Sequence, residues 1–288
     1  HTMTTTAQHQ QSQASIVDDD SNALTDYEAA LYDRGIRVWG VDAQNRLRRS
    51  RVLVVGLGGL NSELVKNIAL AGVGQINIID HHIVTQHDIG LFITSQCVGQ
   101  TRAEASLAGI AELNPLIHVR ADTLSLDAID NEYVKGFTLV CVDTLDSALQ
   151  LRLNVLCRMN NIPFILTHSF GMQAYFFSDL GQVLYQFQQS HNRLPVATSE
   201  SDIKELLKML EDNNKRYNIT PVNKNADIVT SAMSHLHTEI APVCAIVGGI
   251  VGQEIVKVIC RDNEVLNNFF FYDALKGSGL VEPVNIRS

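Results

Sequence analysis

The stretch Arg51-Val-Leu-Val-Val-Gly-Leu-Gly-Gly59 decides the fold of this chain. Its apolar run predicts a buried strand, its clustered glycines predict a tight turn, and residues 60–72 have the spacing of a helix. A second apolar run, Gln75-Ile-Asn-Ile-Ile-Asp80, then ends on an acid. Strand, glycine turn, helix, strand and carboxylate follow one another in the order of a nucleotide-binding βαβ unit.

Gly56, Gly58 and Gly59 are the first candidate binding residues. Without side chains they let backbone N–H groups approach a phosphate at the start of a helix, where the helix dipole favours negative charge. Asp80 stands where a carboxylate accepts hydrogen bonds from ribose hydroxyls. The third glycine of a G-x-G-x-x-G pattern would fall at position 61, which holds Asn61. A turn that only shapes the fold and an acid that only caps a loop explain the same residues equally well.

Composition and charge exclude several classes of protein. With 288 residues, 45% of them hydrophobic, the chain can bury a large core. A formal net charge of −9 disfavours non-specific binding to nucleic acid. The most apolar stretch, residues 240–258, contains Pro242 and several glycines, so we expect no membrane span. The five cysteines form no C-x-x-C pair, and the paired histidines lack further ligands at suitable spacing, so no metal site is expected.

The alternation of apolar segments predicts a doubly wound, mostly parallel Rossmann-like sheet with helices on both faces. Residues 1–25 are polar and are expected to form a disordered tail, and residues 26–171 to form the Rossmann-like domain. Residues 172–288 are expected to complete the same domain as a small α/β extension with antiparallel strands. Besides the βαβ unit, the expected helices cover residues 27–39, 41–50, 99–114, 146–160, 203–216 and 242–259; the expected strands cover residues 117–122, 137–143, 163–168, 173–178, 182–187 and 268–273.

Three further blocks resemble enzymes that activate ubiquitin-like proteins. Tyr32-Asp-Arg-Gly-Ile-Arg-Val-Trp-Gly40 resembles their amino-terminal signature, residues 241–257 their late helix, and Asn267-Asn-Phe-Phe-Phe-Tyr-Asp273 the strand after it. The blocks are most similar to the small, non-catalytic subunits of SUMO-activating enzymes. The family is similar in fold to bacterial adenylating enzymes of molybdopterin and thiamine biosynthesis, in which two domains pair and each ATP site is completed by an arginine of the partner.

The resemblance implies a nuclear, obligate heterodimer with a large catalytic subunit, which would bind ATP and magnesium. That subunit would adenylate the carboxyl terminus of SUMO and then carry SUMO as a thioester, so SUMO would be only an indirect partner of this chain. Arg34 is the residue that would reach the partner's ATP site in trans, with a surface salt bridge to Asp33 or another nearby acid as the alternative. Arg37 would pair with acids at the interface. The late helix and the aromatic strand 268–272 would lie at or near the same interface.

The family pattern also indicates whether this chain is the catalytic half or the degenerate half of the paired enzyme. Active halves carry an N-x-x-R-Q-F element whose arginine neutralises ATP phosphates, but residues 85–98 contain neither Arg nor Lys. Arg102 stands where active halves have a lysine, and arginine positions phosphate differently. Asp143 and Asp146 both match the family's magnesium-binding aspartate. We therefore expect a degenerate half that holds no cofactor of its own, with the glycine turn and Asp80 as vestiges.

Two other functions would also use the βαβ unit. A self-sufficient adenylating homodimer of the molybdopterin or thiamine type would need the phosphate arginine that residues 85–98 lack. An NAD- or FAD-binding protein would use the glycine turn and Asp80, but Asn61 and the missing substrate-site residues argue against it. A catalytic cysteine is not expected either, because Cys141, Cys157 and Cys244 lie in apolar or small-residue contexts.

Overall fold

The computed structural model describes residues 24–160, 162–176, 201–202, 204–205, 207–209, 238–260, 266 and 269–282. Nearly all of the tail expected over residues 1–25, the strand expected over 182–187 and the greater part of the helix expected over 203–216 lie outside the described residues. The helices are α1 (Asp26–Leu31), α2 (Asp33–Trp39), α3 (Val41–Arg49), α4 (Gly59–Leu70), α5 (Arg102–Leu113), α6 (Asn131–Val134), α7 (Ser147–Met159) and α11 (Ala241–Cys260). The strands are β1 (Arg51–Val55), β2 (Gln75–Ile79), β3 (His118–Ala121), β4 (Leu139–Val142), β5 (Phe164–Phe170), β6 (Gln173–Phe176), β7 (Phe269–Asp273) and β8 (Ser278–Glu282).

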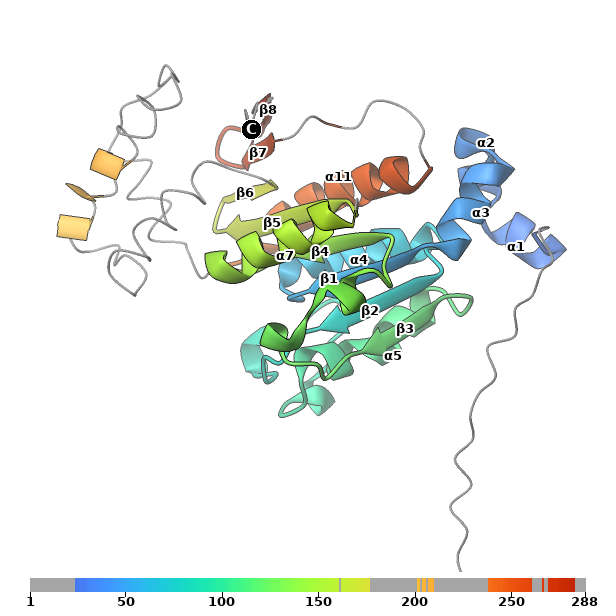
Figure 1. The fold of residues 1–288 in the computed structure, drawn as a ribbon, viewed down its shortest axis with the longest axis horizontal. Helices are drawn as coiled ribbons and strands as arrows, with labels where there is room; N and C mark the ends of the chain where they lie inside the picture. Colours follow the sequence, from blue (N-terminus) through green and yellow to red (C-terminus); the bar gives the residue numbers. More distant parts are fainter. Residues whose placement is uncertain are drawn as a thin grey trace, which may run out of the picture.

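One eight-stranded sheet forms the centre of the molecule, with the strand order β3-β2-β1-β4-β5-β6-β7-β8 (Figure 1). The strands from β3 to β5 in this order are parallel, and β6, β7 and β8 add antiparallel strands at one edge. Because strand order reverses direction between β1 and β4, the sheet has the doubly wound topology that leaves a ligand crevice at that point. The expected mostly parallel α/β fold is confirmed.

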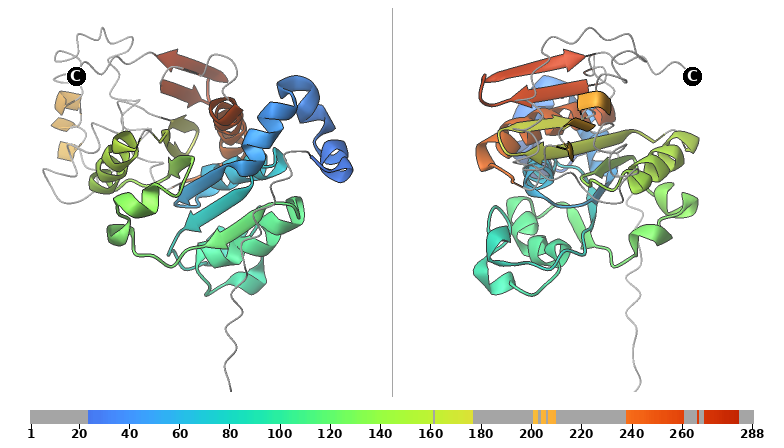
Figure 2. Two further views of the ribbon diagram at one scale, coloured as in Figure 1. Left: turned by 45° about the vertical axis from the view of Figure 1, so that its right-hand side comes forward. Right: turned by 90° about the vertical axis from the view of Figure 1, so that its left-hand side faces the viewer.

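Helices cover both faces of this sheet. The views in Figure 2 show the sheet between the yellow-green helix α7 and the orange helix α11. Along β1, Val52 and Val54 join the core under α4 and α11, whereas Leu53 and Val55 join the core under α7. Successive side chains of a strand point to opposite faces, so a strand buried on both sides must be apolar throughout. This explains the unbroken apolar run of residues 52–55.

The single helix expected over residues 27–39 is wrong, because the structure has two helices with a break at Tyr32. The Tyr32 side chain is buried, and its hydroxyl accepts a hydrogen bond of 2.8 Å from the Asn114 side chain at the end of α5. The chain leaves helical geometry at Tyr32 and resumes as α2. The break thus places Tyr32 in the core and leaves Arg34, two residues later, exposed.

The helix expected over residues 242–259 is present as α11, and its burial fits the expectation of no membrane span. Helix α11 runs through Pro242 and its glycines for 20 residues, with a mean hydropathy of 1.9 in its most apolar window. By length and composition alone it could cross a membrane, but 61% of that window is buried inside the molecule. Its buried Glu254 pairs with Lys257 at 2.7 Å and accepts a hydrogen bond from the Leu266 backbone. These contacts mark α11 as a core helix.

Glycines allow α11 to lie directly against α4. A Cβ atom at Gly248 would lie 2.7 Å from the Cβ of Glu63 and 3.0 Å from the carbonyl oxygen of Leu60. A Cβ at Gly252 would lie 2.7 Å from the Cβ of Asn67. The neighbouring Gly249 differs, since a Cβ there meets nothing within 4 Å.

These two neighbouring glycines give a matched test of the helix contact. We predict that Gly248→Ala lowers the free energy of unfolding by about 1–3 kcal/mol, because the new methyl group forces α11 away from α4. Gly249→Ala should raise it by up to about 1 kcal/mol, since alanine favours a helix and meets no obstacle. Urea unfolding of both variants measures the difference. Equal effects of the two substitutions would show that the helices do not touch as described.

Candidate functional site

A cavity of about 550 Å³ lies at the carboxyl ends of the central parallel strands. Gly56 follows β1, Asp80 follows β2, Asp143 follows β4, and His168 lies in β5; all four line the cavity. The cavity therefore occupies the place where strand order reverses between β1 and β4, which is where open α/β sheets bind ligands. The structure brings the glycine turn and Asp80 together, as the sequence predicts. The same cavity also contains residues that the sequence does not predict for the site.

The glycine turn is required by packing whether or not a ligand binds. Gly56 has φ of +83°, and a Cβ there would lie 2.1 Å from the carbonyl oxygen of Asp143. No other residue type fits, because both the backbone conformation and the space exclude a side chain. A Cβ at Gly58 would lie 2.7 Å from a carboxylate oxygen of Asp143 and equally close to one of Glu239. The turn alone is therefore no indication of nucleotide binding.

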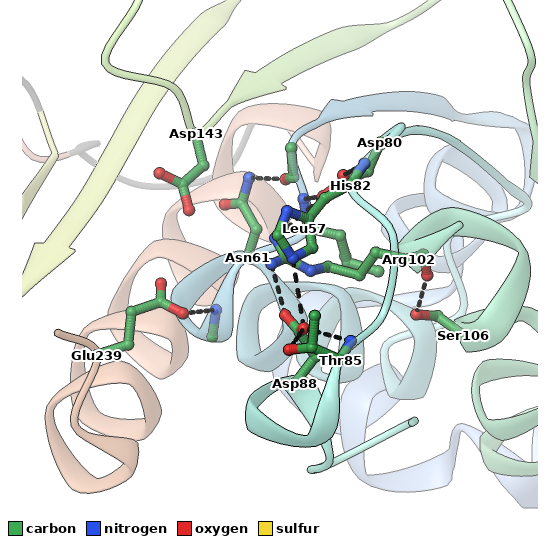
Figure 3. Close-up of polar contacts among 12 residues, drawn as sticks. Leu57, Asn61, Asp80, His82, Thr85, Asp88, Arg102, Ser106, Asp143 and Glu239 are labelled. Atoms are coloured by element: carbon green, nitrogen blue, oxygen red, sulfur yellow. Dashed lines mark hydrogen bonds and ion pairs between the residues drawn. The ribbon is translucent and has the colours of Figure 1, made fainter. Parts of the chain in front are cut away.

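Asn61, which replaces the third glycine of the pattern, is fully buried. Its amide nitrogen donates a hydrogen bond of 2.8 Å to the carbonyl oxygen of Gly56 (Figure 3). Its amide oxygen accepts one of 2.7 Å from the hydroxyl of Thr167 in β5. The side chain thus links the glycine turn to β5 from inside the molecule, with both of its polar groups satisfied.

Both carboxylate oxygens of Asp80 already accept hydrogen bonds from the backbone. The N–H of Leu57 donates at 2.7 Å and the N–H of His82 donates at 2.8 Å. The guanidinium of Arg102 lies 3.3 Å from the same oxygen that Leu57 contacts. Asp80 therefore braces the loops after β1 and β2, which is the loop-capping role that the sequence left open.

Arg102 is the one arginine or lysine among the described residues that line the cavity, and it is held by two acids. Besides Asp80, its guanidinium contacts Asp88 at 2.7 Å, and Figure 3 shows it extended between the two carboxylates. Burial alone would lower the pKa of Arg102, but Asp80 and Asp88 raise it above its ordinary value. The guanidinium is therefore permanently charged and already paired.

Asp88 lies in the segment 85–98, where the resemblance described above implies a phosphate-binding arginine in a catalytic half. Burial acts to raise the pKa of Asp88, but hydrogen bonds from Thr85 and the Arg102 guanidinium outweigh it and hold the pKa well below its ordinary range. The backbone and hydroxyl of Thr85 donate at 2.8 and 2.7 Å. This segment therefore contributes a negative charge where a nucleotide site needs a positive one.

The remaining charged lining residues are also acidic. Asp143 pairs with Nδ1 of His168 at 2.9 Å, and Nε2 of His168 is buried without a hydrogen-bond partner in the described part of the chain. Asp146, the other candidate magnesium ligand, instead caps α7 by accepting from the backbone of Ala148 and Leu149. Of the two aspartates, Asp143 is the one that faces the cavity.

Glu239 is the third carboxylate of the cavity and lies just before α11. One of its oxygens accepts a hydrogen bond of 2.7 Å from the backbone N–H of Gly59, at the start of α4. The other accepts one of 3.2 Å from the hydroxyl of Ser169. The charge of the lining is therefore three carboxylates against one guanidinium.

Arg34 lies away from this cavity. It is exposed on α2 and borders a separate hollow of about 220 Å³ between α2, α4 and α11. The expected alternative, an ion pair between Arg34 and Asp33, is not formed, because Asp33 pairs with Arg37 at 2.9 Å. The structure shows no ion pair of Arg34 within the described residues. Arg37 is paired within its own helix.

The cysteines have the inert character that the sequence predicts. Cys141, Cys157 and Cys244 are buried. Burial raises the pKa of the Cys157 and Cys244 thiols to about 11, and it raises the pKa of Cys141 as well. Because the thiolate is the reactive form, none of the three is suited to act as a nucleophile.

Sequence reasoning missed Asp88, His168 and Glu239 as members of the site. His168 ends the apolar run 163–168, and polar residues at the ends of parallel strands gather at one edge of the sheet, so this position carried a usable signal. Glu239 directly precedes a helix and looks like an ordinary partner of that helix's own dipole. Asp88 fits an exposed loop equally well.

The ion pairs of Arg102 give a test with a defined pH dependence. The folded-state pKa of Asp88 lies below its unfolded value, so its stabilisation is present above about pH 4 and is lost as the pH falls through the folded-state pKa. We predict that Asp88→Asn lowers the free energy of unfolding by about 1–3 kcal/mol at pH 7, and that this difference shrinks on acidification below about pH 4. Urea unfolding across this pH range measures it.

Glu132→Gln is the matched control for this pH series. Glu132 is 77% exposed and pairs with Lys135 on the surface, so its replacement should cost at most about 1 kcal/mol. A loss for Asp88→Asn that is no larger than this, or that grows on acidification, would contradict a buried structural role for the Arg102 pairs.

Comparisons with known proteins support the α/β fold described above. Residues 32–288 match the ThiF family. SUMO-activating enzyme subunit 1 of Dictyostelium discoideum is 39% identical over 310 residues, covering 90% of this chain and 94% of the relative. The human protein of the same name is 32% identical over 335 residues, covering 90% of this chain and 96% of the relative. The crystal structure of E. coli MccB with succinimide is similar in fold, with a TM-score of 0.60 and 16% identity over 88% of this chain and 71% of that chain.

Proposed function

This chain belongs to the ThiF family, and we propose that it is the non-catalytic subunit of a heterodimeric SUMO-activating enzyme. Its partner is a large catalytic subunit that binds ATP and magnesium, adenylates the carboxyl terminus of SUMO and carries the resulting thioester. This chain braces that subunit, supplies Arg34 to its ATP site and performs no turnover alone. The heterodimer acts in the nucleus.

The observation that carries this proposal is the engagement of Arg102 by Asp80 and Asp88. Adenylation places additional negative charge on the phosphates of ATP, and enzymes stabilise that charge with groups that are free to face it. The cavity lining offers three carboxylates and one guanidinium that is already paired. ATP in this cavity would therefore meet repulsion where a catalytic half provides attraction.

The surroundings of Arg34 support its action on a partner. It is exposed, it borders a different hollow from the cavity, and Asp33 is already engaged by Arg37. Large apolar side chains are also exposed on α1, α2, α3 and α4: Leu31 is 48% exposed, Val38 68%, Val41 51% and Leu70 53%. Exposed apolar groups around an arginine that has no ion pair within the described residues are typical of a surface that a partner covers.

The packing of α11 and β7 limits which of their surfaces a partner could contact. The α11 side that packs on α4 is closed, so the part open to a partner is the side that carries Ile246 and Gly249. Ile246 is 44% exposed, and Gly249 borders the same hollow as Arg34. Strand β7 is paired on both edges, by β6 and β8. We therefore propose that the partner contacts α2 and the open side of α11.

Arg34 and Arg37 provide a matched pair for testing the trans contribution. In the co-expressed heterodimer, we predict that Arg34→Ala lowers the rate of SUMO-dependent ATP–pyrophosphate exchange by about 100-fold, because a positive charge at the developing anion is lost. Arg37→Ala removes the same charge from the same helix and should leave the rate close to that of the wild type. Equal rates for the Arg34→Ala variant and the wild type would exclude the trans role.

The isolated chain gives a separate test of the non-catalytic assignment. Without the catalytic subunit it should show no ATP–pyrophosphate exchange, because the one arginine or lysine among the described residues of its cavity is already paired with two acids. Exchange by the purified chain, abolished by Asp143→Asn, would instead indicate a self-sufficient adenylating homodimer.

A further inference from the structure

We propose that Glu239 is an internal anion that occupies the phosphate-binding start of α4 and so excludes polyphosphate from this half of the enzyme. The inference rests on the proposed function, which says that the half is non-catalytic, and it names a residue that keeps the nucleotide out. The carboxylate of Glu239 takes the place that a phosphate group has in a working glycine-turn site.

The first step is the contact at the helix start. Helix α4 has 12 residues, and its first backbone N–H groups have no partner within the helix. Gly58, the residue before the helix, has no side chain with which to cap them. Glu239 supplies the cap instead, since its carboxylate lies 2.7 Å from the N–H of Gly59 (Figure 3). A negative charge there is further favoured by the helix dipole.

The second step is the fixed position of the carboxylate. Its other oxygen accepts from Ser169, which projects from β5. The backbone is held as well, because Glu239 forms a bridge with Gly171 and the N–H of Gly171 donates to the carbonyl oxygen of Thr238. Glu239 is thus anchored through both side chain and main chain. The position of its carboxylate therefore does not depend on side-chain rotamer choice alone.

The third step is the closeness of the carboxylate to the turn itself. A Cβ at Gly59 would lie 3.1 Å from one Glu239 oxygen, and a Cβ at Gly58 would lie 2.7 Å from the other. The carboxylate therefore fills the space that glycines normally leave for a phosphate. A phosphate oxygen would have to displace it and would meet like charge.

Other charges around the turn limit how much Glu239 alone can change. Asp143 also reaches the space above Gly58, with an oxygen 2.7 Å from the Cβ position. The charge of Glu239 helps to raise the pKa of Arg102, but the guanidinium pairs with Asp80 and Asp88 and not with Glu239. Removal of Glu239 should consequently open the site to a weakly held anion without restoring catalysis.

The test uses the full chain labelled with ¹⁵N-glycine and titrated with tripolyphosphate without magnesium. The chain has 18 glycines, and the Gly58 and Gly59 amide signals report on the turn itself. We expect Glu239→Ala to bind tripolyphosphate about tenfold more tightly than the wild type, with shifts at these two signals, because the anion then takes over the helix start. Glu239→Gln should bind with intermediate affinity, since it keeps a hydrogen-bond acceptor but loses the charge. Glu132→Gln, which removes one surface charge, should bind like the wild type.

The outcomes separate the inference from the proposed function. The signal of Gly252, which packs on Asn67 and not on the first turn of α4, shows whether each variant keeps its fold. Glu239→Gln retains the shape of the cap if the alanine variant unfolds. Identical affinities at the turn for the wild type and both Glu239 variants would overturn the role of Glu239 and leave the non-catalytic assignment in place. Tight binding by the wild type at Gly58 and Gly59 would overturn both.

Discussion

The guanidinium of Arg102 lies between the carboxylates of Asp80 and Asp88, 3.3 and 2.7 Å away. These contacts join the end of β2, the loop that follows it and the start of α5. They also engage Arg102, the one arginine or lysine among the described residues that line the cavity, so that its charge is not available to a ligand. Replacing one of the two carboxylates costs about 1–3 kcal/mol, because the buried guanidinium then loses a charged hydrogen-bond partner. The Arg102 guanidinium therefore holds these loops in place. The fold tolerates carboxylates at the other charged positions of the cavity lining.

As a consequence, side chains of the protein itself stabilise the glycine turn and the start of α4, the two places where this type of fold binds a nucleotide. Asn61 holds the glycine turn from inside, and Glu239 caps α4 from the cavity side. On another part of the molecule, burial of Tyr32 breaks the amino-terminal helix and leaves Arg34 exposed. The proposed division of labour follows from this separation: the cavity is structural, whereas the exposed arginine is available to a partner.

The central fold could be predicted from sequence because its signals are local. The apolar run 52–55, the glycine turn and the acid at position 80 define the βαβ unit by spacing alone. The helix break could not be predicted, because it depends on a contact between Tyr32 and Asn114, which are 82 residues apart. Glu239 was hidden for the same reason, since it caps a helix start 180 residues away. Charges that meet only in the folded chain leave no periodic pattern behind.

The number of nucleotides that the proposed heterodimer binds tests the central claim most directly. Equilibrium titration with a non-hydrolysable ATP analogue and magnesium should give one site per heterodimer. Disruption of the catalytic subunit's own glycine turn should abolish that site. A second site that survives this change and is lost on mutation of Gly58 or Asp143 in this chain would contradict the account.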